Sequence, residues 1–458
     1  MSKKRIGISR RKFMRVAAGG AAAAGVAASA TVLKPPFLEA AARPVPPNDR
    51  VGLGIIGVGI QGAILLRTSL SLPGVECVGA AELYTGRLRL AKEIAGDNIF
   101  TTGDYRELLA RPGLDAVIVA TPDHWHAPLV KACCEAGKDV YCEKPMSYTP
   151  QHGLEMIAAE KKHKRIVQVG SQLRSSVIYQ KAREIFASGV LGTVTMVEST
   201  LGRNGPFGAW QYPVPPDAST ETIDWETWLG DAPKRPFDPL RFARWRLYRD
   251  YSNGLAGDLG IHMITGIHTI AGMDQAPSRA KTFGGIFRWK DAREMPDTIT
   301  TLYEYPQFPV YLRITQNTQT VGVTRFLGSG GLLEVGGEAG GVRFVPQDGQ
   351  DSSPNWPANG LPSDFRQEFV RNWREKRVAR PGTGTPEGGG EHFVAPPGYN
   401  MLRDHFFHFF ESVRTRKPSV EDATFGHNAA LACHMSVYSY FNQTTAVWDE
   451  QAGEIRSA

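Results

Sequence analysis

The chain has 458 residues, of which 42% are hydrophobic and 21% charged, and this composition excludes collagen-like, disordered and disulfide-scaffold proteins. The length is sufficient for two or three domains with sizeable cores. The formal charge of +6 comes from the N-terminus, because residues 1–42 hold eight Lys and Arg residues and one acidic residue. The remaining 44 basic and 45 acidic residues nearly balance, so we expect no nucleic-acid partner.

The N-terminus has the features of an export signal. Ser-Arg-Arg-Lys-Phe-Met at residues 9–14 precedes an Ala/Gly-rich run at 16–32 and small residues at 40–42. This order predicts a twin-arginine signal peptide over residues 1–42 and a periplasmic protein exported by the twin-arginine machinery. The run is short for a membrane span and only weakly apolar, so we expect no stable membrane anchor after processing.

The cysteines form no recognisable framework. Their number is odd, two of them are adjacent, and no Cys-x-x-Cys zinc spacing occurs; they are Cys77, Cys133, Cys134, Cys142 and Cys433. This pattern predicts buried free thiols in a protein that folds in a reducing compartment before export.

Residues 51–169 alternate short apolar runs with helical stretches. The expected strands and helices, in chain order, are 51–56, 63–72, 75–81, 86–95, 116–120, 129–136, 139–142, 151–164 and 166–169. Strands that alternate with helices predict βαβ units around a parallel sheet.

Past residue 175 the pattern changes to strands separated by turn signals. The expected strands are 194–201, 280–289, 298–305, 310–316, 331–335 and 342–345, followed by helices at 401–414 and 426–441. Gly/Pro-rich stretches at about 346–362 and 380–399 are typical of surface insertions. This half predicts a C-terminal α/β domain over residues 175–458 with an open, mostly antiparallel sheet.

A glycine-rich turn follows the first expected strand and opens a helix. Gly57 allows the tight turn, Gly59 lets the backbone approach a pyrophosphate, and Gly62 permits close packing of helix on strand. The helix N-terminus, with Ile60 and Gln61 between the last two glycines, offers free N–H groups and a partial positive charge to phosphates. This turn predicts a dinucleotide site.

An acidic residue ends the second expected strand. Glu82 follows Gly62 by about the twenty residues of the dinucleotide fingerprint and can accept hydrogen bonds from the adenosine ribose hydroxyls. A carboxylate there would repel a 2′-phosphate, so we expect NAD rather than NADP, although Arg87 nearby could weaken this preference. The first half therefore predicts an NAD(P)-binding Rossmann domain over residues 43–174.

Two further loops follow expected strands at the edge of the sheet where ligands bind. The residues expected at the nicotinamide end are Thr121, Pro122, His124, His126, Glu143 and Lys144. A lysine there can hold a substrate hydroxyl and stabilise the oxyanion as hydride leaves. A lysine in a surface salt bridge is the alternative interpretation.

Asp258 and His262 stand four residues apart in the second half, on one face if the segment is helical. The histidine can take a hydroxyl proton while the carboxylate sets its tautomer; a capping aspartate and a core histidine are the alternative. His124 and His126, with Asp123, have a spacing that can ligate zinc from a strand. They lie in a loop before a helix, so we expect no metal.

Together these motifs resemble the Gfo/Idh/MocA family of oxidoreductases over roughly residues 48–450. The resemblance implies an N-terminal Rossmann domain and a C-terminal α/β domain with an open antiparallel sheet. It also places Lys144 on the family's catalytic lysine, and Asp258 and His262 on its substrate-binding and acid/base pair.

Some positions differ from the common family pattern. Asp123 stands for Asn in the Thr-Pro-Asn-x-x-His motif, and Leu259 and Thr265 stand where many members carry Asp. Because of these differences, the resemblance does not imply the polyol substrates that are usual in the family. The motifs Trp-Leu-Gly-Asp-Ala-Pro at 228–233 and Arg-Trp-Arg at 244–246 resemble a secreted branch of the family.

The leading hypothesis is an exported NAD(P)-dependent oxidoreductase that takes hydride from a sugar, polyol or glycoside hydroxyl, with tightly bound cofactor. His262 would take the proton and Lys144 would hold the oxygen. The alternatives are an NAD-dependent glycoside hydrolase with transient redox and a non-catalytic dinucleotide-binding sensor. We expect a small carbohydrate substrate and a homo-oligomer formed through the C-terminal sheet.

Overall fold

The computed structural model describes residues 45–336, 340–347, 353–376 and 392–458. The expected signal peptide, residues 1–42, lies outside these ranges. Within them, no helix has the length and apolar character needed to cross a membrane. All five cysteines are free and four are buried, which confirms the predicted thiols.

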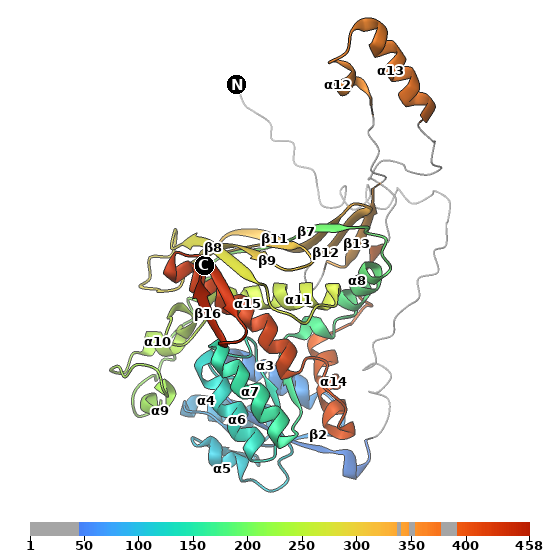
Figure 1. The fold of residues 1–458 in the computed structure, drawn as a ribbon. Coiled ribbons are helices and arrows are strands. Elements are labelled where there is room, and N and C mark those ends of the chain that lie inside the picture. Colours follow the sequence, from blue (N-terminus) through green and yellow to red (C-terminus); the bar gives the residue numbers. More distant parts are fainter. Residues whose placement is uncertain (1–44, 337–339, 348–352, 377–391) are drawn as a thin grey trace, which may run out of the picture. The chain divides into compact units, whose positions relative to one another are not determined.

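The first domain is built on a parallel sheet, as the sequence predicted (Figure 1), and the structure gives its strand order as β3-β2-β1-β4-β5-β6. The strands are β1 (Val51–Ile56), β2 (Val75–Ala81), β3 (Phe100–Thr102), β4 (Ala116–Val119), β5 (Asp139–Cys142) and β6 (Val167–Val169). β4 and β5 are buried at every position, as expected for central strands covered on both faces. β3 was not predicted, because it is a three-residue edge strand with no apolar run.

Helices connect these strands and cover the sheet. They are α3 (Ile60–Leu70), α4 (Thr85–Ala95), α5 (Tyr105–Leu109), α6 (His126–Glu135) and α7 (Pro150–His163). A helix from the far end of the chain, α14 (Met401–Thr415), also packs on this domain. Its Phe406 stacks on Tyr141 of β5 at 4.4 Å between ring centroids, so the C-terminal segment contributes to the core of the Rossmann domain.

The second domain contains a ten-stranded sheet with the order β14-β13-β12-β11-β7-β10-β9-β8-β15-β16. The strands are β7 (Val194–Asn204), β8 (Arg279–Gly285), β9 (Thr298–Glu304), β10 (Pro309–Thr315), β11 (Asn317–Gly328), β12 (Gly331–Gly336), β13 (Val342–Pro346), β14 (His392–Phe393), β15 (Ala446–Asp449) and β16 (Glu454–Ser457). Neighbouring strands are antiparallel except for the pair β7 and β10. The mostly antiparallel sheet is therefore confirmed.

Three helices pack against one face of this sheet: α8 (Val177–Ala187), α11 (Ile261–Ala271) and α15 (Ala423–Asn442) (Figure 1). Two short helices, α9 (Trp225–Leu229) and α10 (Pro239–Ala243), lie in the segment between β7 and α11. A π-helical turn, Ala256–Gly260, leads directly into α11. The remaining helices are α12 (Asn355–Ala358) and α13 (Ser363–Lys376).

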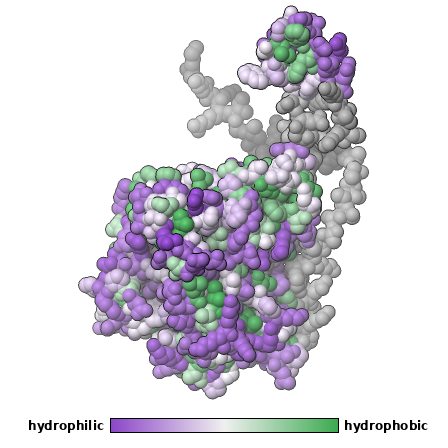
Figure 2. Space-filling view, in the orientation of Figure 1, coloured by the Kyte–Doolittle hydropathy of each residue, from purple (hydrophilic) through white to green (hydrophobic). Residues whose placement is uncertain are grey.

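The opposite face of the large sheet carries exposed apolar side chains. Phe283 on β8 is 63% exposed and Leu302 on β9 is 49% exposed. Figure 2 shows hydrophobic residues at the upper edge, over the strands, although hydrophilic residues cover most of the visible face. Among the described residues, this sheet face therefore keeps some apolar surface exposed.

Candidate active site

A cleft at the carboxyl ends of the parallel strands is lined by residues of both domains. Its first-domain lining includes Gly57, Gly59, Ile60, Gln61, Glu82, Arg87, Thr121, Pro122, Glu143 and Lys144. Its second-domain lining includes Tyr212, Trp228, Phe242, Trp245 and Arg246. Most of the cofactor residues predicted from the sequence therefore meet in one cleft.

The glycine turn has the shape that a pyrophosphate requires. Gly57 has φ +89°, which a residue with a side chain rarely adopts. A Cβ on Gly62 would lie 2.2 Å from the carbonyl oxygen of Gly57, so only glycine allows this packing. A Cβ on Gly59 would meet nothing closer than the Arg87 guanidinium at 3.8 Å. The first turn of α3 has no side-chain cap, so its N–H groups are available to phosphate.

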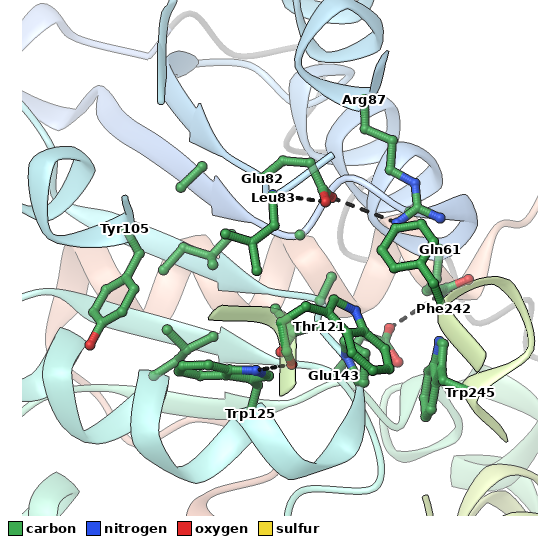
Figure 3. Close-up of a pocket in the computed structure, with 18 of the residues that line it drawn as sticks. Gln61, Glu82, Leu83, Arg87, Tyr105, Thr121, Trp125, Glu143, Phe242 and Trp245 are labelled. Atoms are coloured by element: carbon green, nitrogen blue, oxygen red, sulfur yellow. Dashed lines mark hydrogen bonds and ion pairs between the residues drawn. The ribbon is translucent and has the colours of Figure 1, made fainter. Parts of the chain in front are cut away.

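Glu82 anchors the turn while facing the cleft. Its Oε2 accepts the Val58 N–H at 2.7 Å, and its Oε1 accepts the Leu83 and Tyr84 N–H groups at 3.0 and 3.1 Å. Arg87 forms an ion pair with Glu82 at 3.9 Å, and Figure 3 shows the two side chains close together. Oε1 already accepts two N–H groups, whereas Oε2 accepts one and keeps acceptor capacity for a hydroxyl, which fits a ribose.

The Arg87 guanidinium also faces an aromatic ring from the second domain. Its Cζ lies 5.0 Å from the centre of the Phe242 ring. Phe242 is in α10 and Arg87 in α4, so this contact joins the two domains above one end of the cleft. Sequence spacing gave no indication of Phe242, because about 150 residues separate the two side chains.

At the other end of the cleft, Glu143 is buried behind Lys144. Its Oε1 accepts the Gln61 side-chain amide at 3.1 Å and its Oε2 accepts the Lys144 backbone N–H at 3.1 Å. Burial raises the pKa of Glu143, while the charge of Lys144 opposes this shift. Glu143 thus links the glycine-turn helix to the loop that carries the lysine.

Lys144 crosses to the second domain and binds Asp258. Its Nζ donates to the Asp258 backbone oxygen at 2.8 Å and to Oδ1 at 2.9 Å, and both side chains are 12% exposed. Arg246 Nε donates to the same Oδ1 at 2.9 Å, and the Trp210 indole N–H donates to Oδ2 at 3.2 Å. Burial alone would raise the pKa of Asp258, but the charges of Lys144 and Arg246 hold it well below its usual range.

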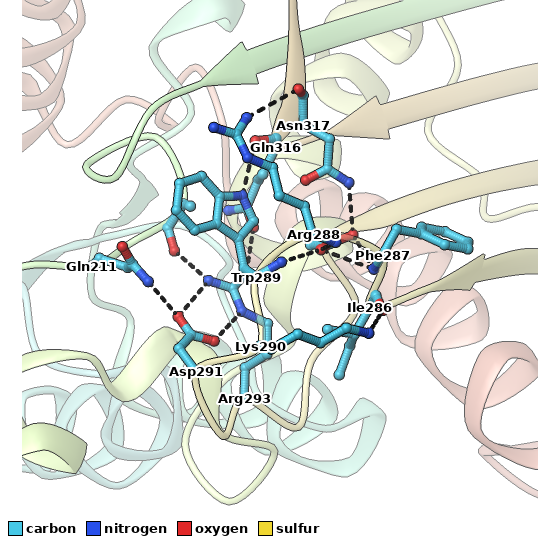
Figure 4. A network of polar contacts seen from close by, with 12 residues as sticks. Gln211, Ile286, Phe287, Arg288, Trp289, Lys290, Asp291, Arg293, Gln316 and Asn317 are labelled. Carbon is cyan, nitrogen blue, oxygen red and sulfur yellow. Dashed lines mark hydrogen bonds and ion pairs between the residues drawn. The ribbon is translucent and has the colours of Figure 1, made fainter.

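A polar network holds the segment that carries Trp210 (Figure 4). Arg293 donates to the carbonyl oxygen of Ala209 at 2.8 Å, to Gln316 Oε1 at 2.8 Å and to Asp291 Oδ1 at 2.7 Å. The guanidinium is nearly inaccessible to solvent, so these bonds form in a low-dielectric environment. The network therefore fixes the indole that donates to Asp258.

His262 lies in the first turn of α11, close enough to Lys144 and Asp258 to feel their charges. Among the residues that the structure describes, none hydrogen-bonds its imidazole. Burial, together with the charge of Lys144, lowers the pKa of His262 to about 3. At neutral pH the imidazole is uncharged and can accept a proton.

His124 and His126 do not line the cleft. The Nε2 of His124 lies 3.1 Å from the carbonyl oxygen of Trp228. The ring nitrogens of His126 lie 2.8 and 3.0 Å from the carbonyl oxygens of Pro145 and Thr121. Both histidines therefore hold backbone segments around the cleft, and no cluster of three metal-ligating side chains occurs in the described ranges.

Asp123, which the sequence argument left outside the site, is buried at the floor of the cleft. Its Oδ2 accepts the Asn253 N–H at 3.2 Å. Burial raises the pKa of Asp123 to about 7, although the charge of Arg246 opposes the shift. The sequence feature that could have indicated Asp123 is its replacement of Asn in the Thr-Pro-Asn-x-x-His motif.

Comparison with known proteins supports the same two-domain division. A model of the oxidoreductase family, NAD-binding Rossmann fold, matches residues 51–171, and one of its C-terminal alpha/beta domain matches residues 176–303. The first domain is thus an NAD-binding Rossmann domain.

Among curated proteins, the chain is similar to two from Saccharopolyspora erythraea. It is 36% identical to inositol 2-dehydrogenase 1 over 32% of this chain and 44% of that protein. It is 29% identical to inositol 2-dehydrogenase 2 over 56% of this chain and 76% of that protein. The chain therefore spans under half the length of the first of these relatives.

Solved structures share the fold at low identity. The aldose-aldose oxidoreductase of Caulobacter crescentus, complexed with glycerol, has a TM-score of 0.62 at 18% identity and covers 87% of this chain and 100% of its own. Levoglucosan dehydrogenase with NADH and levoglucosan has a TM-score of 0.61 at 17% identity, covering 86% and 98%. By the two family models, which together span more than half of its residues, this chain belongs to the Gfo/Idh/MocA family of oxidoreductases.

Proposed function

We propose that this protein is an exported, NAD-dependent oxidoreductase that acts on a CH–OH group of a sugar, polyol or glycoside. The observation that carries the proposal is the largely buried Lys144 ammonium, which lines the dinucleotide cleft and is held by Asp258. A lysine that served only in a surface salt bridge would not be expected to line a cofactor cleft. The names of the curated relatives and solved structures above support a carbohydrate substrate.

The bound NAD would supply the hydride acceptor. Lys144 donates a hydrogen bond to the substrate oxygen and stabilises the negative charge that grows there as the carbinol C–H bond breaks. Asp258 holds the Lys144 ammonium in place, and Trp210 orients Asp258. His262, uncharged at neutral pH, takes the hydroxyl proton, so the substrate loses a hydride and a proton and becomes a carbonyl.

Export places a constraint on this chemistry. The twin-arginine pattern at residues 9–14 supports delivery of an already folded protein to the periplasm, where free NAD is not expected to be maintained. Trp228, Phe242 and Trp245 of the second domain line the cleft together with the glycine turn, and this enclosure by both domains favours slow release of the cofactor. We therefore propose that NAD binds to the protein before export.

A retained cofactor must be regenerated within each cycle. A second carbohydrate carbonyl can take the hydride back, with a proton from His262, so that one sugar is oxidised and another reduced. Return of the hydride to the same sugar after elimination and addition of water would instead give a glycoside hydrolase. Release of phenol from an aryl glycoside without added nucleotide distinguishes the second route from the first.

A homo-oligomer formed through the large sheet is part of the same proposal. Phe283 and Leu302 lie on the sheet face opposite α8, α11 and α15, and exposed apolar side chains of this kind are typical of protein interfaces. A second copy of the chain, placed sheet to sheet, would remove them from water.

Lys144→Ala should lower turnover on the order of a hundredfold or more, because it removes the donor that stabilises the developing oxyanion. Nucleotide content after purification should stay unchanged, since the glycine turn and Glu82 are untouched. The matched control is Lys131→Ala, which removes a lysine paired with Glu155 at 2.8 Å outside the cleft. Turnover that is equal in the two variants would exclude Lys144 from the chemistry.

The pH dependence should follow Asp123 rather than His262. Asp123, with a pKa of about 7, is neutral below that pH and ionised above it. The added negative charge opposes oxyanion formation, so kcat/KM for oxidation should fall as the pH rises through 7. Asp123→Asn should remove this fall in kcat/KM. His262→Ala should slow the reaction but leave the pH at which kcat/KM falls unchanged. If kcat/KM still falls through pH 7 in Asp123→Asn, the ionisation of another group causes the fall.

The mature protein, purified without added nucleotide and then denatured, should release close to one NAD(H) per chain and little NADP(H). Enclosure by both domains explains the retention, and Glu82 explains the selectivity. Clearly substoichiometric nucleotide, together with activity that depends on added NAD, would contradict the closed cycle and indicate an ordinary dehydrogenase.

A further inference from the structure

Arg246 presents an unused hydrogen-bonding edge to the cleft. Its Nε donates to Asp258 Oδ1 at 2.9 Å, and the residue lines the cleft. Within the described part of the chain, no oxygen accepts a hydrogen bond from either terminal amino group of its guanidinium. A guanidinium has five N–H donors, so one committed bond leaves most of its capacity free.

The charges around Arg246 are unbalanced. Lys144 and Arg246 both donate to the Oδ1 atom of Asp258, so one carboxylate is shared by two cations. Asp123 is the other carboxyl group near Arg246, and its burial raises the pKa to about 7, so below that pH it adds little negative charge. Glu143, behind Lys144, has a raised pKa for the same reason.

A third cation lies at the same end. The charge of Arg203, on β7, is felt by both His262 and Tyr212. Among the described residues Arg203 has no carboxylate partner and no hydrogen-bond acceptor. Lys144, Arg246 and Arg203 thus contribute three positive charges, whereas burial raises the pKa of two of the nearby carboxyl groups, Asp123 and Glu143.

Aromatic side chains stand beside the free guanidinium edge. The Arg246 Cζ lies 4.2 Å from the centre of the Trp245 ring, which holds the guanidinium against the indole. Tyr212 also lines the cleft, and Arg244 fixes its backbone by donating to its carbonyl oxygen at 2.9 Å. Figure 3 shows Trp245 among the side chains that line the cleft. Aromatic faces and a charged fork together suit a sugar ring that bears an anionic group.

We propose that the substrate is a carboxylate-bearing sugar, of the uronate or aldonate class, whose carboxylate binds the free edge of the Arg246 guanidinium. The planar guanidinium matches the two oxygens of a carboxylate, and a neutral sugar would leave this charge unmatched. The inference rests on the proposed function, because the same sugar must offer its carbinol to Lys144. It names the substrate class of that site.

The test is binding of matched sugar pairs to the purified holoenzyme. Glucuronate and glucose, and galacturonate and galactose, are titrated by calorimetry, and reduction of the bound nicotinamide is followed by absorbance in parallel. Each uronate should bind at least about tenfold more tightly than its neutral hexose. Arg246→Gln should abolish that difference, and Arg246→Lys, which keeps the charge but loses the planar fork, should reduce it.

Arg325→Gln is the matched control. Arg325 on β11 donates its Nε to a carboxylate of Glu334 at 2.8 Å, in a contact like that of Arg246 but away from the cleft. This variant should keep the full preference for uronates. Thermal unfolding of all variants establishes that they are folded, and Arg246→Lys keeps the test decisive if Arg246→Gln does not fold.

The outcomes separate this inference from the proposed function. Neutral hexoses that bind as tightly as uronates and reduce the bound nicotinamide equally well would overturn the inference and leave the oxidoreductase standing. Uronates that bind through Arg246 without any reduction would support the carboxylate site and contradict the oxidoreductase. Hexose 6-phosphates that bind more tightly than uronates would overturn the assignment to a carboxylate.

Discussion

The contact between Lys144 and Asp258 is the interaction on which the site depends. The lysine follows β5 of the Rossmann domain and the aspartate lies in the π-helical turn before α11, so the ion pair spans the domain boundary. Burying two charges costs several kcal/mol per ion unless hydrogen bonds compensate. Here Arg246 and Trp210 satisfy the carboxylate and the Asp258 backbone oxygen gives the ammonium a second acceptor. The pair is therefore a reason for the two domains to keep one geometry around the cleft.

The two sheets contribute in different ways. The parallel sheet brings the glycine turn, Glu82, the 121–126 loop and Lys144 to a single edge, because these segments all follow strands that run in one direction. The large sheet supplies a rigid support: the Arg293 network ties the Trp210 segment to the strands, and α11 presents His262. The glycine turn, Glu82 and Lys144 thus come from one domain, and Asp258 and His262 from the other.

Local pattern was sufficient for the parts of the fold whose sequence signal is strong. Apolar runs predicted β1, β2 and β5 with the bounds that the structure shows, and the spacing of glycines predicted the turn at Gly57. β11 was missed although it is long, because its first residues are polar and its pairing with β7 is irregular. Tertiary contacts with β7 and β12, rather than an apolar run, make it a strand.

The candidate site shows the same limit. Motif positions predicted Lys144, Asp258 and the glycine turn, because strand ends and helical spacing fix where such residues lie. His124 and His126 have suitable chemistry, but sequence does not give side-chain direction in a loop, and their rings face backbone carbonyls. Arg246 belongs to the Arg-Trp-Arg motif at 244–246, but no role could be assigned to it from the sequence. Its partner Asp258 contacts it only in the folded chain.

The central claim is that a carbinol hydrogen of the substrate moves as hydride to nicotinamide held in this cleft. It is tested most directly by giving the purified holoenzyme a uronate or hexose carrying deuterium on the carbinol carbons, with no acceptor sugar. The nucleotide is then released by denaturation and analysed by mass spectrometry. We expect reduced nucleotide that carries one deuterium from the sugar. Product formed while the nucleotide stays unlabelled would contradict it.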